Sequence, residues 1–380
     1  MKYVIYILVI CSMIGSYFNV NTGITYEDVA CVILLVLSIF KCANNKWTID
    51  RFCKLSALYI PFMIFSALLN GELTNTVFIN YFRNYTWGIL VYFALANNIK
   101  SLQDINKILL LGIAFLIVFM LNFRIMMQSS FSENLATLDF EYGRNNVAFT
   151  ALLFSILFEF LYYSKLVKSY VLLGVVVMTV IIVFCTSRYS MMMLVISYVV
   201  FRIFSKMKLS ASEMLAVASF IFLGPLLYEY IISFMDSSFY ESSQSYLNEK
   251  LNDADGDFWN SRIMDINVKP IQKMLNDDNV LSFFVGNTVS IQHSFFSHTL
   301  ITTGVLGFLC YLITNTKLLV WTFKYKGVHF FLFIMVMVMA CNDFITNARF
   351  IIGLNSVFYG SLCAIMYRYI ALNENANLSK

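Results

Sequence analysis

The sequence predicts an all-α protein that crosses a membrane about twelve times, and its composition is the first indication of this. Of its 380 residues, 59% are hydrophobic and only 13% are charged, and the mean hydropathy is +0.73. A water-soluble domain carries roughly 25% charged residues. Here the charges are confined to short segments between apolar runs of about 17 to 23 residues, each long enough to cross a hydrocarbon core of about 30 Å. These runs lack the two-residue alternation of a membrane β-barrel.

The apolar runs define the expected helices in order. They lie near residues 3–20, 25–42, 53–70, 77–97, 107–123, 146–163, 169–186, 189–206, 212–234, 293–315, 327–344 and 348–370. The first run resembles a signal peptide, but no small-residue cleavage site follows it, so we expect it to be retained as a helix. Glu27 and Asp28 weaken the apolar pattern at the start of the second run. No linker or internal repeat divides the chain, so residues 1–380 are expected to form one membrane domain.

The positions of lysine and arginine orient these helices. If the N-terminus is cytoplasmic, the cytoplasmic loops and the two termini together carry 17 of the 26 basic residues. The short outer loops carry five, and one long outer loop, about residues 235–292, carries four. Because short loops rich in lysine and arginine remain in the cytoplasm, we expect both termini inside and the long loop outside.

The two basic residue types are distributed differently. Fourteen of the 17 lysines fall on the cytoplasmic side, but six of the nine arginines fall on the outer side, namely Arg83, Arg124, Arg144, Arg188, Arg262 and Arg349. Arginine presents a planar fork that binds phosphate through two hydrogen bonds. As a set, these arginines indicate an anionic ligand at the outer face. The alternative is that each one extends to the membrane surface or pairs with a nearby carboxylate.

Arg188 is the strongest single candidate for contact with that ligand. It occupies a very short outer turn between two apolar helices, and the acids nearest to it in sequence, Glu159 and Glu213, are expected near the cytoplasm. Arg83 is expected one or two turns inside the fourth helix, where a charge is costly and is usually functional or paired.

Three further arginines belong to the same predicted outer site. Arg144 precedes the sixth helix, next to two asparagines that are suited to cap it. Arg262 lies in the long loop, at the start of an amphipathic segment. Arg349 follows Asp343 by six residues, so an ion pair between them is an equal alternative to ligand binding.

Two of the three histidines, His293 and His298, flank the start of the tenth helix. Five residues separate them by about 140° around a helix, so they do not share a face as zinc ligands would. With an ordinary pKa near 6.5, His293 suits a general base at the outer surface, and His298 is expected to orient a neighbour, bind substrate or pack. The acidic turn at 253–257 lacks the glycine and glutamate of a calcium loop. We therefore expect neither a metal nor a cofactor.

Four segments resemble the O-antigen polymerases (Wzy type) and O-antigen ligases of bacterial polysaccharide assembly. "TSRYSMMMLVISY" resembles the Ser-Arg turn of that family, and "NNVAFTALLF" resembles its asparagine-containing helix start. "FWNSRIMDINVKPIQKMLNDDNVLSFFVGNT" resembles its loop, in which an arginine precedes a short helix and a glycine. "HSFFSHTLITTGVLG" resembles its histidine-to-glycine helix start, with His293, Gly304 and Gly307 at the matching positions. Ser294 replaces the asparagine that is common in ligases.

The resemblance implies a GT-C-type, metal-independent glycosyltransferase in the bacterial inner membrane, acting on undecaprenyl-pyrophosphate-linked glycan. In this hypothesis His293 is the base, and Arg188 and Arg262 stabilise the leaving pyrophosphate. Substrate contacts are expected from Arg83, Arg144, Arg349 and His298.

A polymerase of oligosaccharide repeat units, assisted by a chain-length regulator, is the favoured function. An O-antigen ligase acting on lipid A core and a flippase of lipid-linked glycan are the alternatives. Nothing in the sequence indicates a nucleic-acid partner.

Overall fold

The computed structural model describes only part of the chain. The described residues are 2–15, 19–21, 24–107, 110–117, 119–120, 144–166, 168, 171–184, 188–205, 268–269, 271–272, 276, 280–286, 295–324, 327–345 and 353–378. The predicted helix near 212–234 and most of the loop at 235–292 lie outside them.

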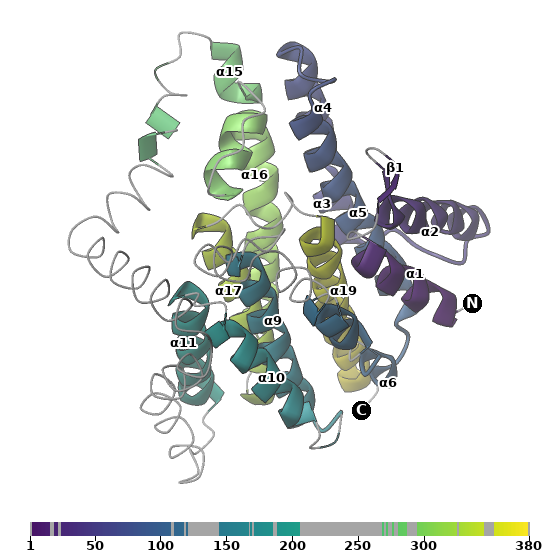
Figure 1. Ribbon diagram of the computed structural model, residues 1–380, viewed down its shortest axis with the longest axis vertical. Coiled ribbons are helices and arrows are strands. Elements are labelled where there is room, and N and C mark those ends of the chain that lie inside the picture. The colour runs from purple at the N-terminus through teal and green to yellow at the C-terminus, as the bar shows by residue number, and fades with distance from the viewer. Residues whose placement is uncertain are drawn as a thin grey trace, which may run out of the picture.

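Helices dominate the described residues (Figure 1). They are α1 (Lys2–Gly15), α2 (Tyr26–Ala43), α3 (Arg51–Ala57), α4 (Tyr59–Leu69), α5 (Thr76–Asn98), α6 (Leu102–Ile105), α9 (Arg144–Tyr163), α10 (Val171–Phe184), α11 (Arg188–Ser205), α15 (Val280–Val285), α16 (Phe295–Phe323), the 3-10 turn η3 (Gly327–Phe330), α17 (Phe331–Ile345) and α19 (Gly353–Leu378). Residues 110–117 are also helical. Strands in this part of the chain are limited to an antiparallel pair, β1 (Asn19–Asn21) and β2 (Ile24–Thr25). Apart from that pair, the all-α prediction is confirmed there.

Among the described residues, two helical stretches are long and apolar enough to cross a membrane, judged by length and composition. They are Arg51–Leu69, of 19 residues, in which Leu58 alone separates α3 from α4, and Phe295–Phe323, of 29 residues. Shorter apolar helices of 10 to 17 residues lie within α1, α9, α10, α11 and α17. The helices are therefore compatible with a membrane protein, and the count of twelve crossings and their orientation stay predictions.

Several helix ends differ from those predicted. Helix α1 ends at Gly15, before strand β1 begins at Asn19. Helices α16 and α19 instead continue eight residues beyond the predicted ends, to Phe323 and Leu378. The polar residues at these ends stay helical, and two asparagine amides there bond to the helix's own carbonyls four residues back: Asn315 to Tyr311 O at 2.9 Å, and Asn373 to Tyr369 O at 3.0 Å. A polar residue at the end of an apolar run thus does not mark the end of a helix.

Helices α5 and α19 pack closely and run parallel. Gly88 lies against Ser356 and Gly360, and two to three turns further along both helices Arg368 Nε donates to Ile99 O at 2.8 Å. A Cβ atom on Gly360 would lie 2.1 Å from the Gly88 carbonyl oxygen, so only a residue without a side chain fits there. Small residues that let two backbones approach in this way are typical of membrane helix pairs.

Ring contacts give the directions of other helix pairs. Helix α9 runs parallel to α19, because Phe154 meets Phe358 and Phe160 meets Tyr369. Helices α11 and α17 are antiparallel: Tyr189 OH donates to Val338 O, and Phe204 stacks on Phe330. These directions are the ones that the predicted order of crossings requires.

Several helices expose apolar faces. On α2, the exposed side chains include Val32, Val36, Ile39 and Phe40, and α10 and α11 carry similar faces, including Leu173 and Ile203. A protein in water rarely exposes continuous apolar patches of this extent, which mark contact with lipid or with another protein.

Candidate functional site

Helix α16 is folded back on itself at Gly304, where φ is +62° and ψ is −171°. The ring of Phe296 lies 4.7 Å from that of Phe308, and the ring of Phe295 lies 5.2 Å from that of Tyr311. Residues twelve positions apart on a straight helix would be separated by about 18 Å. Residues 295–303, here called the half-helix, therefore lie beside the rest of α16.

Two glycines make this fold possible. Gly304 and Gly286 both have positive φ, at +62° and +95°. A Cβ on Gly304 would lie 2.3 Å from the backbone of Phe284, and one on Gly286 would lie 2.4 Å from Thr302 O. The end of α15 thus touches the bend of α16 backbone to backbone (Figure 1). Asn70, at the end of α4, adds a hydrogen bond to Gly286 O at 3.3 Å.

The half-helix is buried although several of its side chains are polar. Ser297, His298, Thr299, Thr302 and Thr303 are all at most 4% exposed. The three threonine hydroxyls donate to helix carbonyls four residues back, at 2.6 to 2.8 Å. The threonines therefore satisfy their hydroxyls locally, as is common for threonine in apolar helices.

His298, predicted as a substrate contact, is 1% exposed. The edge of its ring meets that of Tyr81 on α5, with centroids 4.5 Å apart, and the ring of Phe295 lies 6.4 Å away. The structure thus places His298 inside the helix bundle, between aromatic rings. Its contact with a substrate stays a prediction.

Asp343, near the end of α17, is the residue that the sequence reasoning missed as a site residue. Its side chain is 1% exposed, and its Oδ2 accepts the Tyr311 hydroxyl at 2.7 Å. A buried acid among apolar helices is costly and usually has a function. The sequence carries a signal for it, since Asp343 is the acid in the apolar run 327–344, although its spacing to Arg349 indicates only an ion pair.

The helices that begin with two predicted arginines pack near α17. Helix α11 begins at Arg188, and the next residue, Tyr189, contacts the α17 backbone at Val338. Helix α9 begins at Arg144 and packs against both α11 and α17. The structure describes the backbone of these two arginines and not their side chains. His293, Arg262 and Arg349 lie outside the described residues, so their roles also stay predictions.

Arg83 has an acidic partner from another helix. Its Nη1 lies 3.4 Å from Asp28 Oδ2, with the two side chains 25% and 13% exposed. Asp28 also accepts the Trp87 indole N–H at 2.9 Å and forms the capping box of α2 with Thr25. The adjacent Glu27 is 2% exposed. The ion pair gives Arg83 a structural role that competes with the predicted role in ligand binding.

Replacing Arg83 and replacing Asp28 are expected to lower the free energy of unfolding by different amounts. Arg83→Gln should lower the free energy of unfolding by about 1 kcal/mol, because a partly exposed pair contributes little. Asp28→Asn should cost about 2 kcal/mol, since the carboxylate also caps α2 and accepts the indole. Unfolding in detergent measures both. Unchanged stability of both variants would contradict the pairing. If Arg83→Gln protein stays folded but loses activity while Asp28→Asn protein keeps it, Arg83 would be assigned to ligand binding.

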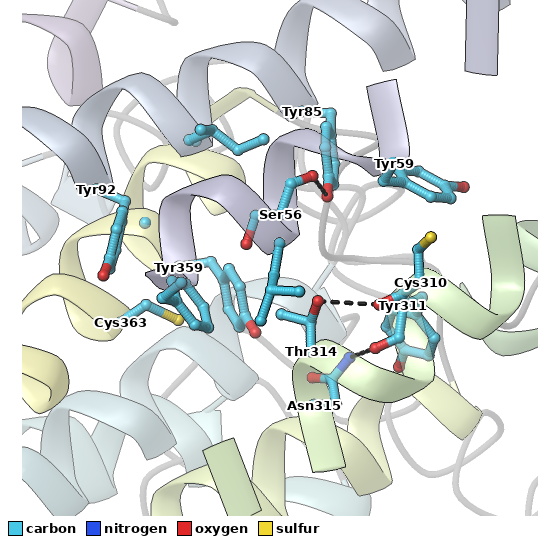
Figure 2. A pocket seen from close by; sticks show the side chains of 15 residues that line it. Ser56, Tyr59, Tyr85, Tyr92, Cys310, Tyr311, Thr314, Asn315, Tyr359 and Cys363 are labelled. Atoms are coloured by element: carbon cyan, nitrogen blue, oxygen red, sulfur yellow. Dashed lines mark hydrogen bonds between the residues drawn. The ribbon is translucent and has the colours of Figure 1, made fainter. Parts of the chain in front are cut away.

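A cavity lined by several tyrosines lies between α3, α4, α5, α16 and α19 (Figure 2). Its volume is about 50 Å³, enough for a few water molecules. Several polar groups in its wall are already bonded to protein: Tyr85 to Ser56 O at 2.9 Å, Thr314 to Cys310 O at 2.9 Å, and Asn315 to Tyr311 O (Figure 2). The wall thus presents mainly rings and methylene groups, and we assign the cavity no chemical step.

Comparisons with known proteins do not identify the chain. No protein-family model, no curated protein and no solved structure matches it. In the part of the chain that the structure describes, no three His, Cys, Asp or Glu side chains are placed to hold a metal ion.

Proposed function

We propose that this protein is a membrane glycosyltransferase that polymerises undecaprenyl-pyrophosphate-linked oligosaccharide repeat units at the outer face of the bacterial inner membrane. The product would be O-antigen or a related surface polysaccharide. The resemblance of four segments to the O-antigen polymerases supports this, as do the exposed apolar faces of α2, α10 and α11.

The fold of α16 is the observation that carries the proposal. The segment resembling the family's helix start, "HSFFSHTLITTGVLG", contains the bend at Gly304 and the buried half-helix. His298 of this segment and Asp343 are buried among apolar helices, where ionisable side chains are costly and usually functional. A reaction site within the bundle accounts for their position.

In the proposed reaction His293 takes the proton of an acceptor sugar hydroxyl. The hydroxyl oxygen then bonds to the anomeric carbon of the donor, the bond between that carbon and the phosphate oxygen breaks, and undecaprenyl pyrophosphate leaves with the electron pair. Arg188 and Arg262 would stabilise the charge that develops on the pyrophosphate, where one preorganised donor contributes about 3 kcal/mol. General base catalysis contributes roughly 10²- to 10⁴-fold. The remaining proposed substrate contacts are Arg83, Arg144, Arg349 and His298.

Deleting the gene in its own host tests the proposed function. On a gel of surface polysaccharide, we expect core lipid that carries a single repeat unit, without the ladder of longer products. A polymerase defect stops chain growth but allows one unit to be made, exported and attached. Loss of the single unit as well would instead indicate a ligase or a flippase.

A transporter of lipid-linked glycan is the second candidate, because it too would account for the bend in α16. Interrupted helices line the binding sites of many membrane transporters. The two candidates differ in their products, because a transporter moves the lipid-linked glycan across the bilayer without changing its length. A ligase would also leave the length of the repeat polymer unchanged while joining it to a new acceptor.

A further inference from the structure

The pair formed by Asp343 and Tyr311 connects two halves of the candidate site. The Tyr311 hydroxyl donates to Asp343 Oδ2 at 2.7 Å, and the carboxylate is 1% exposed. A hydrogen bond that is buried away from water is costly to leave unmade. This hydrogen bond therefore joins α16 to α17 and holds the Tyr311 side chain in one rotamer.

The ring of Tyr311 also holds the half-helix in place. Its centroid lies 5.2 Å from that of Phe295, with the two rings nearly perpendicular, and 6.1 Å from that of Phe308. Phe295 is itself only 1% exposed and packs among Tyr59, Tyr81 and Tyr85. Rotation of the Tyr311 ring would thus remove one wall of the pocket that receives Phe295.

We propose that Asp343, acting through Tyr311, is a positioning residue for glycosyl transfer. The inference rests on the proposed function. Phe295 begins α16, two residues after His293 in the sequence. Asp343 fixes the Tyr311 ring, that ring fixes Phe295, and Phe295 anchors the start of the half-helix, which follows the proposed base in the sequence. Because Asp343 is buried and bonded to Tyr311, it acts through the tyrosine and does not touch the substrate.

This arrangement predicts a specific kinetic change. Tyr311→Phe removes the hydroxyl and keeps the ring, and Asp343→Asn keeps the side-chain shape but replaces the carboxyl group by an amide. Each should lower kcat about 10- to 100-fold, the loss expected when a catalytic group is displaced by about 1 Å. KM should stay within about twofold, since neither residue binds substrate. The double variant should match the more impaired single variant, because both residues act through one contact.

Tyr92→Phe is the matched control. The Tyr92 hydroxyl donates to Asp50 Oδ2 at 3.0 Å, so this variant also removes a tyrosine–aspartate hydrogen bond. That bond joins α5 to the start of α3 and does not contact the half-helix. Its kcat should equal that of the unmodified protein.

The experiment uses the purified full chain, an undecaprenyl-pyrophosphate-linked repeat unit as substrate, and thermal unfolding of each variant. A fall in kcat for Tyr311→Phe and Asp343→Asn, but not for Tyr92→Phe, is the expected result. Normal kcat in both variants, or a loss explained entirely by less folded protein, would overturn the positioning role while leaving the polymerase proposal intact. Absence of elongation by the unmodified protein would overturn the proposed function and this inference with it.

Discussion

Gly304→Ala is expected to lower the free energy of unfolding by about 2–6 kcal/mol and to abolish activity. The backbone of Gly304, with φ +62° and ψ −171°, lies in a region that is almost exclusive to glycine, and it costs a residue with a Cβ about 1–3 kcal/mol. The added Cβ would also lie 2.3–2.4 Å from backbone atoms of Phe284 and Val285, which cannot move aside as a flexible side chain can. Overpacking of this kind adds about 1–3 kcal/mol. Chemical unfolding in detergent measures the loss.

Variants of two other glycines distinguish the cost of backbone strain at a positive φ from the cost of close contacts made by the added Cβ. Gly71 and Gly327 have φ of +68° and +63°, and a Cβ on either would meet nothing within 4 Å. Gly71→Ala and Gly327→Ala should therefore cost only the strain of about 1–2 kcal/mol. Gly286→Ala, which crowds the same bend from α15, should resemble Gly304→Ala. Equal losses in all four variants would show that the contact between α15 and the bend contributes nothing.

Arg188→Ala is expected to reduce glycan polymerisation about 100-fold at normal protein levels. One preorganised donor to a developing anion is worth about 3 kcal/mol, and Arg188 is the proposed donor at the start of α11. Arg188→Lys should restore only part of the rate, since a lysine cannot form the two parallel hydrogen bonds of a guanidinium. Polymer length on a gel and protein level on an immunoblot measure the two quantities.

Arg51→Ala serves as the control for loss of an arginine. Arg51 is exposed at the first position of α3 and belongs to the predicted cytoplasmic side. Its replacement should leave the polymer ladder unchanged. A normal ladder with Arg188→Ala would remove Arg188 from the mechanism.

Helix positions could largely be predicted from the sequence because hydrophobicity is a local property. The ends of some helices are also local: Asp50 accepts the Cys53 N–H at 2.8 Å to start α3, and Asn75 accepts the Val77 N–H at 2.9 Å to start α5. The fold-back of α16 could not be predicted in this way. Gly304 lies in a continuous apolar run, and glycine is common in straight membrane helices. The positive φ of Gly304 accompanies its close contact with α15, and no sequence pattern around Gly304 indicates that contact.

The chemistry of individual charged residues was harder to predict. Arg83 and Asp28 are 55 positions apart, so no sequence spacing indicates their pairing. Tyr311 and Asp343 are 32 positions apart and meet because α16 and α17 pack together. The sequence indicates the arginines of the predicted outer face as a group by their bias in position, but their individual partners depend on helix packing that no short sequence motif encodes.

Purified protein in liposomes tests the proposed polymerase activity most directly. The lipid-linked repeat unit is supplied on the predicted outer face, with no nucleotide or metal added, and product length is followed by gel and mass spectrometry. The proposal predicts products of two, three and more repeats, with release of undecaprenyl pyrophosphate. Glycan that crosses the bilayer at unchanged length, or stays unchanged in place, would contradict it.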